Sequence, residues 1–65
     1  MDEDRKKQIG LCVKHIRKMR NMTQEQLAES ADLSVTFISN IENGKISISA
    51  ETVIRLSMAL KVSSD

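Results

Sequence analysis

The sequence predicts a single all-α domain, a compact bundle of short helices. Two observations lead to this prediction. Apolar residues recur at the spacing of a helical face through most of the chain, and residues that start or stop helices stand between the apolar segments. The one alternating run, ISIS at 46–49, has no candidate partner strand and is predicted to be a loop.

The composition limits what the protein can be. A chain of 65 residues fits one domain, and its one cysteine excludes an internal disulfide and argues against a zinc site. No apolar run approaches the roughly 20 residues of a membrane span, and the charged N-terminus lacks a signal core, so we expect a cytoplasmic protein. Residues 1–4 are expected to be disordered. With one histidine, no glycine-rich phosphate loop and no paired carboxylates on a common face, we expect neither an enzyme nor a bound metal or cofactor.

The first helix is predicted from Asp4 to about Arg20. Its apolar stripe is expected to be buried and consists of Ile9, Cys12, Val13, Ile16 and Met19. The net charge of the whole chain is only +1, yet residues 5–20 contain no acid and seven bases, namely Arg5, Lys6, Lys7, Lys14, Arg17, Lys18 and Arg20. Such a segment is either a solvated helix face or an electrostatic footprint for nucleic acid.

A helix-turn-helix is predicted at about residues 23–43. Thr23, with Gln26 three residues later, forms a capping box that opens a short helix, and Asp32 tolerates the left-handed backbone of the tight turn that ends it. Ser34 caps the next helix and Gly44 stops it. The residues expected on the buried sides are Leu27, Ala28, Ala31, Ile38 and Ile41, with Phe37 and Glu42 beside them.

The last helix is predicted from Ala50 to about Lys61, with Ser49 as its cap. Its expected buried residues are Val53, Leu56 and Leu60. A second apolar face of this helix is a candidate homodimer face and consists of Ile54, Met58 and Val62.

The segment TQEQLAESADLSVTFISNIENGK resembles the helix-turn-helix of the Cro and phage-repressor (Xre-type) family. The matching positions have the family spacing without a gap, and they are Thr23, Gln24, Leu27, Ala28, Ser34, Ile38, Ser39, Ile41, Glu42 and Gly44. The flanking segments KHIRKMRNMTQ and SAETVIRLSMALKVS are also similar, so essentially the whole chain is covered. Asp32, Ile48 and Lys61 depart from the family, which usually has Gly, Pro and Gly there.

The resemblance implies a lambda-repressor-like bundle of four helices, or five in longer relatives. It also implies a sequence-specific regulator of transcription that binds double-stranded DNA, as a repressor or a restriction-modification controller-like protein. A homodimer would bind a palindromic operator through the major groove.

The helix after Ser34 exposes small neutral side chains, whereas an ordinary solvated face favours Lys and Glu. Base edges offer donors, acceptors and thymine methyls to such groups. By similarity, the residues expected to read bases are Val35, Thr36, Ser39 and Asn40. The residues expected to contact phosphates are Thr23, Gln24, Ser34, Phe37, Asn43 and Lys45. Phe37 has a second interpretation, packing at the edge of the core, and Gln24 could simply be solvated.

Arg17 and Glu42 each flank the buried stripe of their helix, and the family commonly pairs an Arg with a Glu at these positions. The resemblance therefore implies a partly buried ion pair, and Arg17 is not counted as a DNA contact.

The alternative function is a protein-interaction module on the same fold, such as an antitoxin or a co-activator-like bridge. Glu25 and Glu29 lie one turn apart on the exposed side of their helix. They are either ordinary solvated surface or, as in phage repressors, a contact for RNA polymerase.

Overall fold

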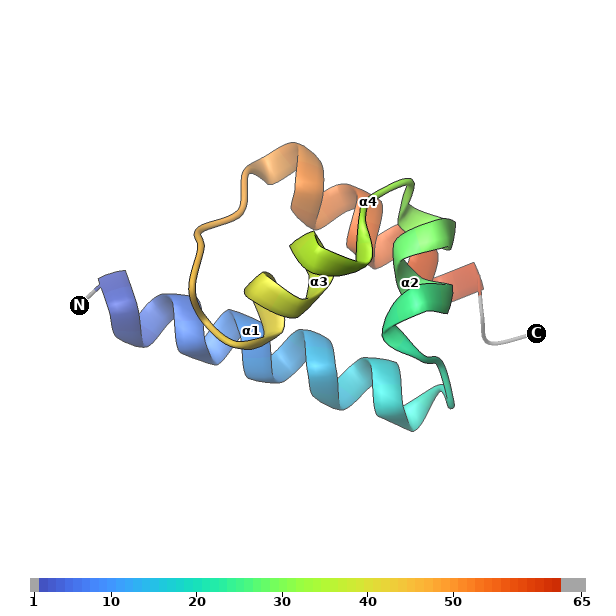
Figure 1. Cartoon of the computed structure of the whole chain (residues 1–65), viewed down its shortest axis with the longest axis horizontal. Helices are drawn as coiled ribbons and strands as arrows, with labels where there is room; N and C mark the ends of the chain where they lie inside the picture. Colours follow the sequence, from blue (N-terminus) through green and yellow to red (C-terminus); the bar gives the residue numbers. More distant parts are fainter. Residues whose placement is uncertain (1, 63–65) are drawn as a thin grey trace.

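Four helices make up the regular structure of the computed structural model, which describes residues 2–62 and the side chains of residues 4–61. They are α1 (Asp2–Met19), α2 (Gln24–Ala31), α3 (Val35–Glu42) and α4 (Ala50–Val62). α3 packs against α1 and α2, and α4 packs against α2 and, less extensively, against α1 (Figure 1). No strand occurs within residues 2–62. The all-α prediction is therefore confirmed, and ISIS is a loop.

The signals that delimit the helix-turn-helix act as predicted. The Thr23 hydroxyl accepts a hydrogen bond from the Gln26 backbone N–H at 3.0 Å, and the Gln26 side chain accepts from the Thr23 N–H at 2.9 Å. Asp32 takes up the left-handed conformation at φ 59° and ends α2. The Ser34 hydroxyl caps α3 by accepting from the Phe37 N–H at 3.1 Å. α3 stops before Gly44, whose φ of 71° favours glycine.

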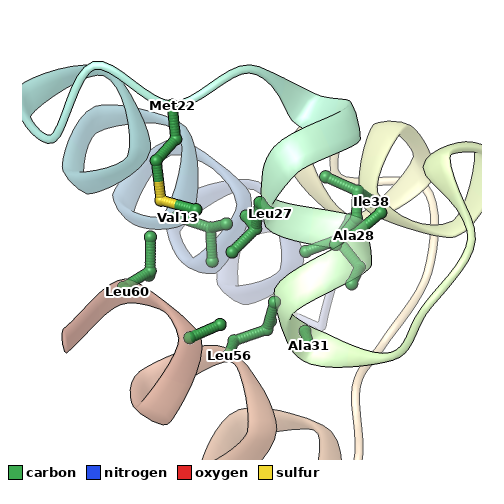
Figure 2. Close-up of a cluster of buried hydrophobic side chains, with 10 residues drawn as sticks. Val13, Met22, Leu27, Ala28, Ala31, Ile38, Leu56 and Leu60 are labelled. Carbon is green, nitrogen blue, oxygen red and sulfur yellow. The ribbon is translucent and has the colours of Figure 1, made fainter. Parts of the chain in front are cut away.

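The core lies where α1, α2, α3 and α4 meet (Figure 2). Its buried side chains are Val13, Met22, Leu27, Ala28, Ala31, Ile38, Ile41, Leu56, Ala59 and Leu60. Leu33, Phe37, Ile46 and Ile48 are partly buried against it. The buried residues predicted for α2 and α3 are all confirmed. Met22, which the sequence pattern presents only as a break between helices, extends from its turn into the core in Figure 2.

The buried face of α1 differs from the predicted apolar stripe. Gly10, Val13 and Arg17 are buried, whereas the remaining four members of the stripe are exposed, namely Ile9, Cys12, Ile16 and Met19. The reason is that α1 packs chiefly against the C-terminal end of α3. That contact buries the side of α1 that carries Gly10 and Arg17, and most of the apolar stripe faces away from α3.

The N-terminal end of α1 also differs from prediction. The helix begins at Asp2 and so includes residues 2–4, which we expected to be disordered, while Met1 lies outside the described residues. Asp4 lies in the first turn of this helix, where an acid is favoured by the partial positive charge of the exposed N–H groups.

α4 is capped as predicted, because the Ser49 hydroxyl accepts from the Thr52 N–H at 3.3 Å. Leu56 and Leu60 are buried as expected, but Val53 is 44% exposed and Ala59 takes its place in the core. Since Ala59 is small, this side of α4 can approach α2 closely, which rotates Val53 toward solvent. None of the described helices has the length and apolar character needed to cross a membrane.

Candidate nucleic-acid interface

The outward side of α3 is a polar surface supported by apolar anchors. Ile38 and Ile41 are 0% and 1% exposed and fix the helix to the core. On the opposite side, Thr36 is exposed and Asn40 is half-buried. The remaining predicted base readers lie beside them, with Val35 40% exposed and Ser39 half-buried. The four predicted base readers therefore lie on one accessible side of one short helix.

The surface continues past the end of α3. The Asn43 side-chain amide donates to the Ser39 hydroxyl at 3.3 Å, so both side chains face the same way. Gly44 turns the chain, and the Lys45 backbone N–H donates to the Asn40 carbonyl at 3.0 Å. Lys45 is exposed directly after this turn. A cation is thus placed at the end of the polar surface.

The N-terminal ends of α2 and α3 carry the other predicted phosphate contacts. The hydroxyl oxygens of Thr23 and Ser34 accept backbone N–H groups of their own helices, and each O–H remains able to donate to an anion. Gln24 is partly buried, and its amide donates one hydrogen bond to Glu42 Oε1 at 3.0 Å. The second N–H of that amide is left for a further acceptor. Gln24 is therefore an oriented side chain and not a freely solvated one.

Arg17 and Glu42 form the predicted ion pair. Arg17 Nε lies 2.7 Å from Glu42 Oε2, and a second guanidinium nitrogen lies 3.1 Å from Oε1. A third nitrogen donates to the Met22 carbonyl at 2.7 Å. The two side chains are only 10% and 2% exposed. This bidentate pair joins α1, the turn before α2 and the end of α3 in one network with Gln24.

Gly10 is a positioning residue that the sequence interpretation missed. A Cβ atom built on Gly10 would lie 2.2 Å from the Ile41 carbonyl oxygen and 2.8 Å from that of Glu42. Only glycine lets α1 approach the end of α3 this closely. The available signal was a glycine in the middle of a helical pattern, which often marks close packing.

Phe37 is half-buried and packs against the core. This agrees with its interpretation as a core-edge residue and leaves only its outer part available to DNA. Glu25 and Glu29 are exposed on α2. Neither carboxylate side chain has a hydrogen bond or an ion pair to any other described residue.

The predicted dimer face lies on α4, away from the side that packs on α2. Ile54 and Met58 are 59% and 63% exposed, and the Val62 side chain lies outside the described residues. A groove of about 440 Å³ separates this helix from α1 and is lined in part by Ile9, Cys12, Ile16, Val53 and Ser57. Three of the four exposed members of the predicted α1 stripe, Ile9, Cys12 and Ile16, thus face α4 across an open groove.

A helix-turn-helix with a polar, accessible second helix places the chain in the class of helix-turn-helix proteins. The comparison of its sequence with known families identifies the family. The helix-turn-helix family model matches residues 13–65, so the chain belongs to this family, in its Xre-type branch.

Similar curated proteins come from bacilli and their phages. The chain is 43% identical over 55 residues to the control protein C.BamHI of Bacillus amyloliquefaciens, covering 83% of this chain and 68% of that protein. It is 39% identical over 54 residues to an immunity repressor protein of Bacillus phage phi105, covering 83% of this chain and 38% of the repressor. It is 30% identical over 56 residues to an ImmF control region 10 kDa protein of the same phage, covering 86% of this chain and 62% of that protein. The chain therefore spans less than two thirds of the two phage proteins.

Proposed function

We propose that this protein is a sequence-specific regulator of transcription that binds double-stranded DNA with α3 in the major groove. The observation that carries the proposal is the outward side of α3, where neutral hydrogen-bonding groups replace the charged residues of an ordinary solvated helix. Family membership and the similarity to an immunity repressor and a control protein support it. Repression, or restriction-modification control, is the proposed role.

In this proposal each half-site is read by the side chains of one α3. The Asn40 amide offers one donor and one acceptor, which suits the adenine edge, while Val35 and Thr36 offer methyl groups to thymine. Ser39 reads a base beside them. Thr23, Gln24, Ser34, Asn43 and Lys45 contact phosphates and fix the position of the helix in the groove. The outer part of Phe37 lies against the sugar-phosphate backbone.

A homodimer through Ile54, Met58 and Val62 completes the proposal. Two-fold symmetry would place two recognition helices about 34 Å apart and require a palindromic operator. Exposed apolar side chains on α4 support this choice of face. Glu25 and Glu29 are the candidate contact for RNA polymerase, and the cytoplasm is the proposed location.

The test is selection of bound duplexes from a random DNA library at low and at moderate salt. An enriched palindrome that persists at moderate salt is the expected result. Binding without an enriched sequence that disappears at moderate salt would overturn the proposal, because only non-specific attraction would remain. The protein-interaction function would then be examined on the Glu25–Glu29 side of α2 and on the Ile54–Met58 side of α4.

A further inference from the structure

The two long sides of α1 have different compositions. Lys7, Lys14 and Lys18 are separated by seven and four residues, which places them on one side of the helix. The other side carries Ile9, Cys12 and Ile16, which line the groove toward α4. Lys7 and Lys18 are exposed and Lys14 is half-buried. The three lysines share their side with the exposed Leu11, and Lys14 and Lys18 also border a hollow on α1 that Leu11, Cys12 and Ile16 line. We call Lys7, Lys14 and Lys18 the α1 lysine row.

One end of the α1 lysine row adjoins the end of α3. A Cβ built on Gly44 would lie 2.8 Å from Lys7 Cγ and 3.0 Å from Lys7 Cα, so the stem of Lys7 packs on the Gly44 backbone. Asn43 and Lys45 stand on either side of that glycine in the chain. Figure 1 shows the loop that follows α3 passing beside the N-terminal half of α1. Lys7 therefore extends the surface that ends in Lys45.

The other end of the row approaches the beginning of α2. The backbone carbonyl of Lys18 accepts a hydrogen bond from the Asn21 N–H in the turn after α1. That turn leads directly to Thr23 and Gln24. α1 thus runs between the two places where phosphate contacts are proposed. From Lys7 to Lys18 the row rises about 16 Å along the helix axis. Phosphates of one DNA strand recur every ~3.4 Å along the duplex axis, so a row of this length can meet more than one of them.

Among the residues whose side chains are described, no acid is paired with a lysine of the row. Within the described residues, none of the three lysines has an ion pair or a side-chain hydrogen bond. The nearest acid along the helix whose side chain is described is Asp4, three residues before Lys7, and it is also unpaired. Arg17, in contrast, is buried with Glu42 and is unavailable to DNA. Within the described part of the chain, the basic segment thus contains one cation that belongs to the structural ion pair, Arg17, and three lysines without such a pair.

We propose that the α1 lysine row binds DNA phosphates next to those contacted by α2 and α3, widening the footprint without reading bases. This inference rests on the proposed function and adds three residues to its phosphate contacts. A free ammonium on a flexible stem attracts a phosphate without a fixed geometry, so the row contributes affinity and salt dependence and no sequence preference.

The test measures dissociation constants of the full chain by fluorescence anisotropy between 50 and 200 mM salt. The probes are the duplex recovered by selection and a mixed-sequence duplex of the same length. Each of Lys7→Gln and Lys14→Gln should make the slope of log K against log salt shallower by about 0.9 per bound subunit. Base preference should not change. Asp4→Asn should tighten binding, because it removes an anion beside the row.

Arg5→Gln is the matched control. Arg5 belongs to the same basic segment but lies on the other side of α1, near Ile46 and Ile48. Equal slopes for wild type and the lysine variants, or an equal change for Arg5→Gln, would overturn the inference while leaving the proposed function intact. A wild-type protein that binds neither duplex would overturn both. Circular dichroism of each variant measures whether the fold is preserved. At position 7, glutamine keeps most of the stem that packs on Gly44.

Discussion

The outward sides of α3 and α4 differ, although both helices pack on the same core. α3 exposes Thr36 and half-exposes Ser39 and Asn40, which are neutral hydrogen-bonding groups. α4 exposes apolar side chains, and Ile54 and Met58 are 59% and 63% accessible. A helix side that contacts only water favours Lys and Glu over the neutral groups of α3 and the large apolar groups of α4. The comparison indicates that each side suits a different partner, a polar groove for α3 and a protein surface for α4.

The two helices also differ in how they are held to α1. α3 is fixed by close backbone approach at Gly10 and by the buried Arg17–Glu42 pair. Between α4 and α1 lies a groove of about 440 Å³. A helix that reads base edges needs a fixed position, because displacements of an ångström break hydrogen bonds. An apolar side that binds a flexible partner tolerates more adjustment.

The largest effect on this comparison should come from removing the ion pair that fixes α3. Arg17→Met would leave Glu42 buried with only Gln24 to compensate it, at a cost of about 3–5 kcal/mol in the free energy of unfolding. Urea denaturation followed by circular dichroism measures the change. Equal stability of wild type and variant would contradict the role given to the pair. The double variant Arg17→Met/Glu42→Leu should recover much of the loss, because no unpaired charge remains.

Gly10→Ala tests the close approach of α1 and α3. Alanine in a helix normally stabilises by about 1 kcal/mol relative to glycine. Here the added Cβ would meet the Ile41 carbonyl oxygen at 2.2 Å, so the expected result is a loss of about 1–3 kcal/mol. Thermal denaturation measures it. Gln8→Ala, at an exposed position of the same helix, is the control and should be close to neutral. A more stable Gly10→Ala variant would contradict the packing described here.

Asn40→Ala tests the outward side of α3 alone. Under the proposed function it should relax the preference at one base pair per half-site by about 1–3 kcal/mol. Binding to operator variants measures this preference. Lys45→Ala should lower affinity evenly across sequences and reduce the salt slope. If both variants weakened all sequences alike, Asn40 would be a backbone contact.

Met58→Glu tests the outward side of α4 alone. A buried charge in a dimer interface should weaken self-association by at least about tenfold, or ~1.4 kcal/mol. Analytical ultracentrifugation measures the dimer dissociation constant. Leu11→Glu is the control, since Leu11 is also 63% exposed but lies on α1 away from this face. If Leu11→Glu weakens self-association and Met58→Glu does not, the dimer forms through another surface.

The smallest expected effect concerns the turn that orients α3 relative to α2. Asp32 holds a φ of 59°, and its side chain makes only a weak contact with Arg55 at 3.9 Å. Asp32→Gly should therefore stabilise by about 0.5 kcal/mol, raising the melting temperature by about 2–4 °C. Asp32→Ala should destabilise, because alanine disfavours this conformation. Thermal denaturation measures the melting temperatures of both variants.

The helix-turn-helix was predictable because its signals are local. Caps at Thr23 and Ser34, the left-handed Asp32 and the buried Ile38 and Ile41 all follow from spacing and residue type. The ion pair was expected from the family resemblance, and its bidentate geometry and the hydrogen bond from Gln24 needed the structure.

The face of α1 was not predictable in the same way. Its apolar stripe gives a regular helical pattern, yet burial is decided by which neighbour approaches, and α3 approaches the line of Gly10, Val13 and Arg17. A missing side chain and a charged one carry no apolar signal. The same holds for Val53, which Ala59 replaces in the core because a small residue permits closer packing.

The hydrogen bond from Gln24 to Glu42 has a consequence for the entropy of complex formation. A free glutamine side chain must be immobilised when it meets a ligand, which costs about 0.5–1.5 kcal/mol. Gln24 is already oriented at 3.0 Å by a carboxylate that Arg17 holds in place. Under the proposed function, most of that ordering is therefore completed during folding, and docking on DNA begins from a preorganised contact.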